Sequence, residues 1–509
     1  MKKILLLAFL PLMAQADPVE IDGIYYNLNN TSLTAEITVP NNCSGVYSGE
    51  VTIPSTVTYD GNNYSVTTIG KWAFLGCDDL ASVTIPNSVT SIGIQAFREC
   101  GRLTSISIPN SVTSIGDEAF GACSALTSIT IPGSVTDIGK FAFDGTAWYD
   151  NQPNGLVYAG KVAYGYKGTM PTNTNITLEE GTKGIAGMAF MFCIGLTSVT
   201  IPNSLITIGE CAFYGCSGLT SVTIPEGMIS IGDQAFEECS GLTSINIPNS
   251  VTSIGNGAFN GCNSLQSVTL SNSLTTIGEN AFQYCIGLTS ITIPKSVTSI
   301  SWGPFGGCSG LASIVVEDGN PFYDSRNNCN AIIETATGKL IQGCKNTIIP
   351  ENVTSIGEKA FFGCSDLTSI TIPSSVTSIL WLAFTGCDNL SEVTSYIENP
   401  FYLDYGEGRF NVHDDVLYTT TLYVPAGTKE LYQEMPGWRF NNIVEMESAP
   451  KVDFNEDSKM DVTDVVTLIN CISKNDFTGI SKEAADVNGD GEVNVTDVVT
   501  LILMIAKAK

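Results

Sequence analysis

The chain has 509 residues, of which 15% are charged, and its formal net charge is −28. A surface this acidic repels phosphates and anionic lipid, which excludes nucleic acid and bare membrane as good partners. A chain of this length exceeds one compact hydrophobic core, so we expect an architecture that grows by adding units.

The first sixteen residues have the pattern of an export signal. Lys2-Lys3 is followed by the apolar run Ile4–Met13 and by the small-residue site Ala14-Gln15-Ala16. The apolar run is too short to span a bilayer. We therefore predict a cleaved signal peptide over 1–16, an exported protein located outside the cell or on its surface, and no membrane insertion.

A 23-residue pattern recurs twelve times between residues 70 and 391. Its phenylalanine falls at positions 74, 97, 120, 143, 190, 213, 236, 259, 282, 305, 361 and 384, and the two longer intervals contain insertions at 144–184 and 317–350. A fixed period of this length predicts a solenoid, in which each coil buries its apolar face only against its neighbours. Segments 17–69 and 392–448 are expected to cap its ends, because an open sheet edge recruits other chains.

One coil can be followed from residue 103 to residue 125. Ile106 and Ile108 alternate with polar residues as in a strand, and Pro109 ends that strand. Residues 112–115 form a second short strand, and residues 117–120 suit one helical or 3₁₀ turn. Like strands of successive coils should pair in parallel at about 4.8 Å, which would stack the phenylalanines into a ladder.

A column of cysteines accompanies this ladder. The cysteines are Cys77, Cys100, Cys123, Cys193, Cys216, Cys239, Cys262, Cys285, Cys308, Cys364 and Cys387. In-register neighbours keep their Cβ atoms about 4.8 Å apart, whereas a disulfide needs about 3.8 Å, so we expect most of these thiols to stay reduced. Thr146 occupies the slot in one coil, which indicates that size matters more than sulfur there. The column has no His or acidic partner with which to bind a metal.

The two insertions carry their own candidates. Residues 331–341 read as a hairpin turning near Ala336-Thr337, and a symmetric register would place Cys329 opposite Cys344, either bridged or free. The aromatic residues of the insertions are Trp148, Tyr149, Tyr158, Tyr164, Tyr166, Phe322 and Tyr323. They either fill the core of a deformed coil or form a bump that contacts a ligand.

Signals for catalysis are weak. The one histidine, His413, stands beside Asp414 and Asp415, and the chain has no Gly-x-Ser-x-Gly motif and no nucleotide-binding loop. Paired carboxylates could act without histidine, but no acidic slot recurs on the coils. A regular stacked surface favours binding, so we predict that the protein is not an enzyme.

Two twelve-residue stretches near the C-terminus share one polar spacing. Candidate oxygen ligands occupy positions 1, 3, 5, 9 and 12, with a backbone carbonyl at position 7: Asp453, Asn455, Asp457, Lys459, Asp461 and Asp464, then Asp486, Asn488, Asp490, Glu492, Asn494 and Asp497. Such a loop can wrap a hard cation such as Ca²⁺. Loop two has Gly491 at the sharp turn where loop one has Ser458, so the first site is expected to be weaker or strained. Apolar residues at helical spacing follow each loop, and residues 462–469 are identical to 495–502.

The repeat resembles the BspA-like leucine-rich repeats of bacterial surface proteins. The matching blocks are Leu-Thr-Ser-Ile-Thr-Ile-Pro-Asn-Ser-Val-Thr-Ser-Ile-Gly and Ala-Phe-x-Gly-Cys, for example 242–255 and 258–262. Segments 21–64 and 421–428 resemble the family's caps. The resemblance implies a β-rich leucine-rich-repeat solenoid of parallel strands with short helical turns, and a role in adhesion or recognition. The ligand, whether protein or glycan, is unknown.

The duplicated loop and helix over 449–509 resemble a type I dockerin, a small all-α calcium-binding module. The resemblance implies two bound Ca²⁺ ions and docking onto a cohesin-type protein through the helices and the residues at loop positions 10 and 11, here Val462, Thr463, Val495 and Thr496. Ile469 and Ile502 stand where the family often has a basic residue, so partner specificity stays open. The alternative is a calcium-stabilised terminal domain without a cohesin partner.

Two hypotheses for function follow. In the first, the solenoid is a recognition or adhesion arm that the dockerin attaches to a cohesin-bearing partner. In the second, the protein is an accessory subunit of a dockerin-organised polysaccharide-degrading complex, and the solenoid binds glycan or a partner enzyme.

Overall fold

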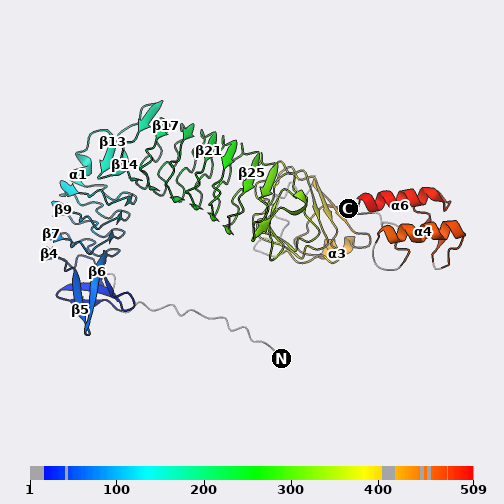
Figure 1. Cartoon of the computed structure of the whole chain (residues 1–509), viewed down its shortest axis with the longest axis horizontal. Coiled ribbons are helices and arrows are strands. Elements are labelled where there is room, and N and C mark those ends of the chain that lie inside the picture. The colour runs from blue at the N-terminus through cyan, green and yellow to red at the C-terminus, as the bar shows by residue number, and fades with distance from the viewer. Residues whose placement is uncertain are drawn as a thin grey trace.

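The computed structural model describes residues 17–40, 44–403, 419–446, 452–455, 460–478 and 480–507. The predicted signal peptide at 1–16, His413 with its acidic neighbours, and the loop-one residues Asp457 and Lys459 lie outside this range. Within it, the chain forms a long β-solenoid and a C-terminal helical module (Figure 1).

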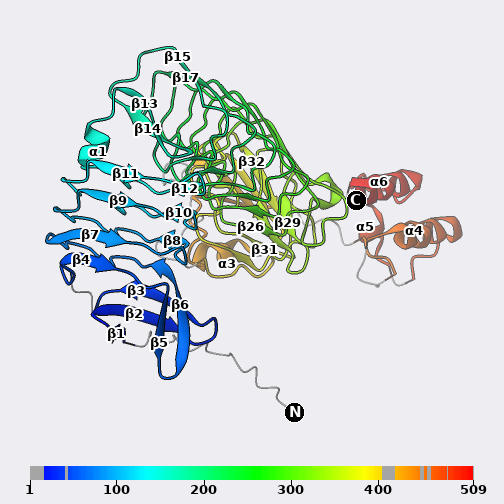
Figure 2. The same cartoon turned by 60° about the vertical axis from the view of Figure 1, so that its left-hand side comes forward.

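Each coil contributes two short strands to two parallel ladders, which Figure 2 shows side by side in the N-terminal coils. The first strands are β7 Leu80–Thr84, β9 Ser105–Ser107, β11 Ser128–Thr130, β15 Thr174–Thr177, β17 Leu196–Thr200, β19 Ser221–Val222, β21 Ser244–Asn246, β23 Ser267–Thr269, β25 Ser290–Ile293, β27 Ser313–Val316, β32 Ser369–Ile372 and β34 Glu392–Ser395. The second strands are β8 Ser91–Ile92, β10 Ser114–Ile115, β12 Asp137–Ile138, β16 Gly184–Ile185, β18 Thr207–Ile208, β20 Ser230–Ile231, β22 Ser253–Ile254, β24 Thr276–Ile277, β26 Ser299–Ile300, β31 Ser355–Ile356 and β33 Ser378–Ile379.

The register places identical slots above one another, as the period predicts. Ile106 of β9 faces Ile129 of β11, and Ile115 of β10 faces Ile138 of β12. The phenylalanine ladder is confirmed: Phe213 and Phe236 stack at 5.1 Å between ring centroids with planes 4° apart. Parallel rings in this core are buried on both faces, so each coil depends on its neighbours for stability.

The segment around each core phenylalanine differs from the expected helical turn. Glu118 and Ala122, two residues before and after Phe120, have left-handed backbone with φ of 49° and 57°. Their N–H groups donate to the next coil, to the carbonyls of Lys140 at 2.8 Å and Asp144 at 2.7 Å. Because alternate N–H groups bond between coils rather than along the chain, the segment is a stacked turn and not a helix.

The cysteine slot has a polar role that size alone does not explain. The Cys239 thiol is fully buried and donates to the carbonyl of Phe213 in the preceding coil at 3.2 Å. The same bond recurs at Cys100, Cys123, Cys216, Cys262, Cys285, Cys308 and Cys387. Thr146, the one exception in the slot, donates its hydroxyl to the carbonyl of Phe143 in its own coil at 2.7 Å. The slot therefore holds a small hydrogen-bond donor, and its thiols are free.

The array turns a corner at the first insertion (Figure 1). On the second-strand side the flanking coils touch: the Thr207 hydroxyl donates to the Thr136 carbonyl at 2.7 Å, and a Cβ on Gly184 would lie 2.0 Å from that oxygen. On the first-strand side β11 and β15 belong to separate sheets, and α1 Ala147–Asp150 follows β11. The inserted hairpin of β13 Gly155–Ala159 and β14 Val162–Lys167 joins the second-strand ladder, where β14 pairs with β16. One side stays in contact while the other opens, so the coil axis bends.

The insertion aromatics mostly fill the core. Tyr164 is buried, its ring lies 5.2 Å from Phe143, and its hydroxyl accepts the Phe143 N–H at 2.9 Å in place of the next coil's carbonyl. Burial raises the pKa of this phenol. Trp148, Tyr149, Tyr158 and Tyr166 pack half-buried against the same core, and Tyr323 is buried. Phe322 alone of the seven is largely exposed.

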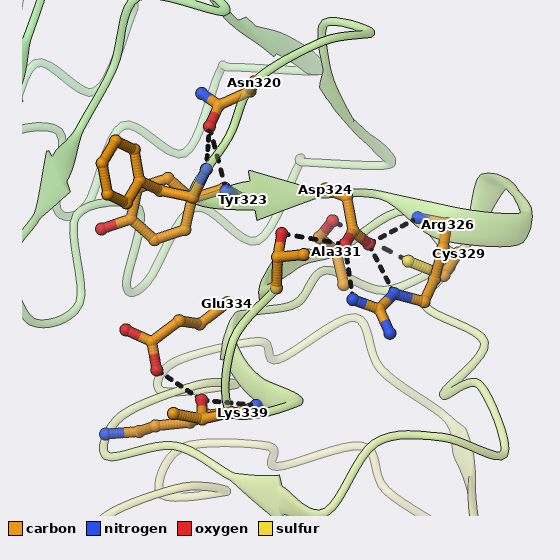
Figure 3. A network of polar contacts seen from close by, with 11 residues as sticks. Asn320, Tyr323, Asp324, Arg326, Cys329, Ala331, Glu334 and Lys339 are labelled. Atoms are coloured by element: carbon orange, nitrogen blue, oxygen red, sulfur yellow. Dashed lines mark hydrogen bonds and ion pairs between the residues drawn. The ribbon is translucent and has the colours of Figure 1, made fainter.

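The second insertion is a polar network around a bent hairpin (Figure 3). It comprises β28 Tyr323–Asp324, the 3₁₀ turn η2 Arg326–Asn328, β29 Ile332–Glu334 and β30 Lys339–Gln342. Asp324 accepts hydrogen bonds from the Arg326 backbone N–H and from its Nε at 3.1 and 2.6 Å. Burial alone would raise the pKa of Asp324, but the bonds from Arg326 outweigh it and lower that pKa.

Cys329 and Cys344 do not face each other in this hairpin. The register slips by one residue between Ile332 and Ile333, so Cys344 lies nearer Asn330, whose carbonyl its thiol contacts at 3.4 Å. Both thiols are buried and free. The symmetric register that favoured a bridge is interrupted by this bulge.

The ends of the array are covered. At the N-terminus β1 Val19–Ile21, β2 Ile24–Asn29, β3 Thr34–Thr38, β4 Gly49–Thr52, β5 Thr56–Tyr59 and β6 Asn62–Ile69 precede the coils. At the other end β35 Thr421–Val424, α3 Lys429–Glu434 and β36 Asn442–Glu445 continue the first-strand ladder. Tyr432 and Trp438 pack edge to face at 5.0 Å and close the core there.

Candidate metal centre and docking surface

The C-terminal module consists of two loop–helix units around a small core. Helices α4 Val462–Lys474 and α6 Val495–Lys507 lie side by side, and the short α5 Lys482–Ala485 leads into the second loop (Figures 1 and 2). Leu468 and Leu501 occupy matching positions and are fully buried. Because 462–469 and 495–502 have the same sequence, the two units present the same faces to the core and to solvent.

Loop two is curled around its own backbone N–H groups. The Asp486 carboxylate accepts from the N–H of Asp490 at 3.0 Å and of Gly491 at 2.7 Å, and the Asp490 carboxylate accepts from Glu492 at 2.9 Å. Gly491 has φ of +86°, a backbone that glycine adopts without strain. These bonds hold loop positions 1, 5 and 7 in one tight turn, as the spacing predicts for a cation-binding loop.

The acidic residue at loop position 12 clamps each loop to its helix. Asp497 is fully buried, and its two oxygens accept from the N–H groups of Asn488 at 3.1 Å and Asn494 at 2.8 Å. Asp464 does the same in loop one, accepting from Phe454 and Asp461 at 2.8 Å each. Spacing predicts that these residues are ligands, but it does not reveal this clamping role.

The residues at position 11 belong to the same framework. Thr463 donates its backbone and side-chain groups to the Asp461 carboxylate at 2.7 and 2.6 Å, and Thr496 does so to Asn494 at 2.8 and 2.9 Å. Both threonines remain exposed at the helix starts. Each threonine therefore connects the cation-binding loop to the exposed surface of the helix, where a partner protein could make contact.

The donor chemistry of the loops fits a hard cation. Carboxylate and amide oxygens dominate loop two, and Asp453, Asn455, Asp461 and Asp464 supply the same atom types in the described part of loop one. Within the described residues no three His, Cys, Asp or Glu side chains gather closely enough to hold a metal. The position-12 carboxylates instead satisfy backbone N–H groups, and the position-9 ligand of loop two is an amide.

Each helix also carries a solvent-facing apolar stripe. In α4 the exposed residues are Val462, Val466 and Ile469; in α6 they are Val495, Val499 and Ile502, with Leu503 beside them. Val462 and Val495 are each 68% exposed, and Val466 and Val499 are each 52% exposed. Steps of four and three residues place each set on one helix face. Val466 and Val499 extend the predicted surface, and their identical spacing in the two repeats is the signal that could have found them.

Comparison with known proteins agrees with both parts of this architecture. The family model described as a BspA type leucine rich repeat region matches residues 53–151, 165–250, 183–312 and 339–404, and the dockerin type I domain matches 451–506. The chain belongs to the BspA-type leucine-rich-repeat family and ends in a type I dockerin, a class of calcium-binding module. A search among curated proteins finds no match.

Several solved structures are similar to this chain. A leucine-rich repeat protein from Bacteroides ovatus is 30% identical with a TM-score of 0.34, over 74% of this chain and 94% of that one. A leucine rich cell surface protein from Faecalibacterium prausnitzii is 27% identical with a TM-score of 0.27, over 72% and 94% of the two chains. The pneumococcal vaccine antigen PcpA is 15% identical with a TM-score of 0.29, over 84% and 98%.

None of the helices in the described part of the chain is long and apolar enough to cross a bilayer.

Proposed function

We propose that the protein is a non-enzymatic binding protein of the cell exterior, which its dockerin attaches to a cohesin-type partner when calcium is bound. The observation that carries this proposal is the pair of matching apolar stripes on α4 and α6, each beginning directly after a calcium-type loop. A helix face that exposes three branched aliphatic residues favours burial against another protein. The solenoid then forms an arm that extends away from the attachment point.

Calcium couples the loops to this surface. We propose two ions, held by the oxygens of Asp453, Asn455, Asp457, Lys459, Asp461 and Asp464 and of Asp486, Asn488, Asp490, Glu492, Asn494 and Asp497, with Lys459 and Glu492 contributing backbone carbonyls. A bound divalent cation neutralises the carboxylates that converge in each loop. The position-12 clamp then orders the first turn of the helix, where Val462, Thr463, Val495 and Thr496 form the partner-binding residues.

The duplication implies two equivalent docking orientations. Full-length protein should be captured by immobilised cohesin domains in calcium and released by EGTA. Val462→Asp or Val495→Asp alone should leave capture largely intact, because the other helix still docks, whereas the double variant should lose it. Capture that is unaffected by EGTA, or that survives the double variant, would contradict docking through these stripes.

A second candidate function has its own support. An accessory subunit of a polysaccharide-degrading complex would use the same dockerin but bind glycan or an enzyme through the solenoid. Exposed aromatic rings on the array favour this candidate: Phe192 and Tyr284 are 57% and 45% exposed. Binding of full-length protein to a glycan array rather than to host proteins would distinguish it from the adhesion arm.

A further inference from the structure

A groove of about 590 Å³ crosses five consecutive coils in the longer part of the array. Phe192 stands at one end and Tyr284 at the other, each two residues after a core phenylalanine. Ile286, two residues after Tyr284, also lines the groove and is 49% exposed. Ile194 occupies the matching position after Phe192, outside the lining, and is 67% exposed. The groove therefore has an aromatic ring at both ends and an aliphatic side chain beside one of them.

The floor between the two ends is polar and low. The three intervening coils place Gly215, Glu238 and Gly261 in the slot of the two rings, and Ser217, Ser240 and Asn263 in the slot of the two isoleucines. None of the hydrogen bonds among the described residues uses the side chains of these two serines or of Asn263. Hydroxyl, amide and carboxylate groups thus face solvent along the whole floor.

Both rings stand on left-handed backbone. Phe192 and Tyr284 have φ of 55° and 57°, which is strained for a bulky residue. The same backbone recurs in this slot in the other coils, most of which have glycine there, for example Gly215 and Gly307, while one has Ala122. What distinguishes these two coils is therefore the size of the side chain, since the array holds two large rings in a slot where its own pattern favours a small residue.

The next coil supports each ring. A Cβ on Gly215 would lie 2.5 Å from Cδ1 of Phe192, and a Cβ on Gly307 would lie 2.4 Å from Cδ1 of Tyr284, so each ring rests against glycine backbone. Tyr214 packs edge-on to Phe192 at 5.3 Å, and Phe362 does so to Tyr284 at 6.2 Å. Both rings are thus braced on one face and at one edge while remaining about half exposed.

We propose that this groove binds an extended, uncharged polysaccharide, a ligand class that rests on the proposed binding role of the solenoid. Aromatic faces stack on the C–H faces of pyranose rings, and the polar floor between them offers hydrogen bonds to sugar hydroxyls. Core rings beneath the groove are spaced 5.1–5.4 Å per coil, which is comparable to one sugar unit of an extended chain. The two rings then contact sugars about four units apart.

Charge and polarity argue against other occupants. A polyanion is repelled by a chain of net charge −28 and by Glu238 at the centre of the floor. An apolar peptide or helix would bury Ser217, Ser240 and Asn263 without partners, which is unfavourable. A neutral polysaccharide can form hydrogen bonds with the polar floor through its hydroxyl groups and stack on the aromatic rings at the two ends.

Affinity electrophoresis of full-length protein in calcium tests the site. The probes are mixed-linkage β-glucan, xyloglucan and galactomannan, with polygalacturonate as the anionic comparison. The test variant is Phe192→Gly with Tyr284→Gly, which restores the array's own residue in both slots and should leave the melting temperature unchanged or higher. The matched control is Phe141→Gly, which removes an exposed left-handed aromatic outside the groove, in a slot that is glycine at 257 and 303.

We expect at least one neutral polysaccharide to retard the protein, the double variant to bind at least tenfold more weakly, and Phe141→Gly to bind normally. Retardation by polygalacturonate alone, by none of the probes, or equally in the double variant would overturn the proposal. If sedimentation shows that the protein forms a dimer and that the double variant does not, the groove binds a second copy of the chain instead, which would also overturn the proposal. Cohesin capture measured on the same samples separates the two proposals, because groove variants should leave it unchanged.

Discussion

The solenoid and the dockerin are stabilised by opposite kinds of group. The solenoid core consists of stacked phenylalanines and aliphatic residues, with buried thiols, eight of which donate a hydrogen bond to a phenylalanine carbonyl of the preceding coil. Among the described residues the two fully buried carboxylates, Asp464 and Asp497, both belong to the dockerin. The array can therefore lengthen without burying a charge, whereas we expect the dockerin to need a bound cation that balances its acids.

Calcium removal should have the largest effect on stability, and it should affect the dockerin but not the solenoid. The dockerin core has eight buried hydrophobic residues, and we expect so small a core not to offset the repulsion among the acidic residues of the two loops without a cation. Calorimetry of the full chain should show two transitions, and EGTA should abolish the dockerin transition while leaving the solenoid transition in place. A ligand at a hundred times its Kd contributes about 2.7 kcal/mol. Identical thermograms with calcium and with EGTA would refute this division.

Alkaline pH should destabilise the solenoid, whereas calcium removal destabilises the dockerin. Burial raises the pKa of Cys193 to about 11 and of Cys364 to about 12. A thiol whose pKa is higher in the folded state holds its proton more tightly there. Its contribution is complete below the unfolded pKa, about 8.5, and is lost as pH rises through 11 to 12.

Several other thiols of the solenoid are buried in the same way. Each unit by which the folded pKa exceeds the unfolded pKa corresponds to about 1.4 kcal/mol of unfolding free energy. Urea unfolding in calcium should therefore show the solenoid losing several kcal/mol between pH 8 and pH 11. The dockerin transition in the same samples is the internal reference, because its helices carry one half-buried cysteine, Cys471. A solenoid whose unfolding free energy is flat over this range would contradict the stabilising role of neutral thiols.

Truncating one rung of the ladder should cost about 3–5 kcal/mol. Phe236 is fully buried between Phe213 and Phe259 at 5.1 and 5.4 Å, so Phe236→Ala leaves a cavity with stacked rings on both sides. The loss should appear in the solenoid transition of a denaturant titration, with the dockerin transition unchanged. Phe192→Gly is the control, because it removes a ring of the same size from the rim and should raise stability by about 1 kcal/mol through relief of left-handed strain. Equal losses from both variants would show that position in the ladder does not matter.

The sequence predicted the ladder because a repeated coil has few ways to bury its apolar residues. Phe120 and Ile115 recur every 23 residues, and stacking like on like satisfies both slots at once. The left-handed turns could not be predicted in the same way, because the N–H groups of Glu118 and Ala122 bond to the next coil. The bulge beside Ile333 that separates Cys329 from Cys344 is likewise a property of strand pairing.

The candidate sites, too, include features that local sequence predicts and features that depend on the folded chain. Loop spacing alone was enough to predict oxygen ligands for the dockerin, since those residues are close in sequence, and that ligand set stays a prediction. The clamping role of Asp497 and the groove between Phe192 and Tyr284 depend on groups that only the folded chain brings together. The available signal for the groove was the presence of aromatic residues in a slot that is otherwise mostly glycine.

The smallest expected effect tests what the cysteine slot requires. If size alone governed it, Cys239→Val would be tolerated better than Cys239→Ser. Because the thiol donates to the Phe213 carbonyl at 3.2 Å, we expect serine, which keeps the donor, to be the more stable variant by about 1 kcal/mol. The difference should be measured at neutral pH in calcium, where the dockerin contributes equally to both proteins. Thr146, in the one coil without cysteine, keeps a hydroxyl but donates it to the carbonyl of Phe143 in its own coil, so it is a precedent for a donor in the slot and not for the bond between coils. A valine variant as stable as the serine variant would restore the interpretation by size.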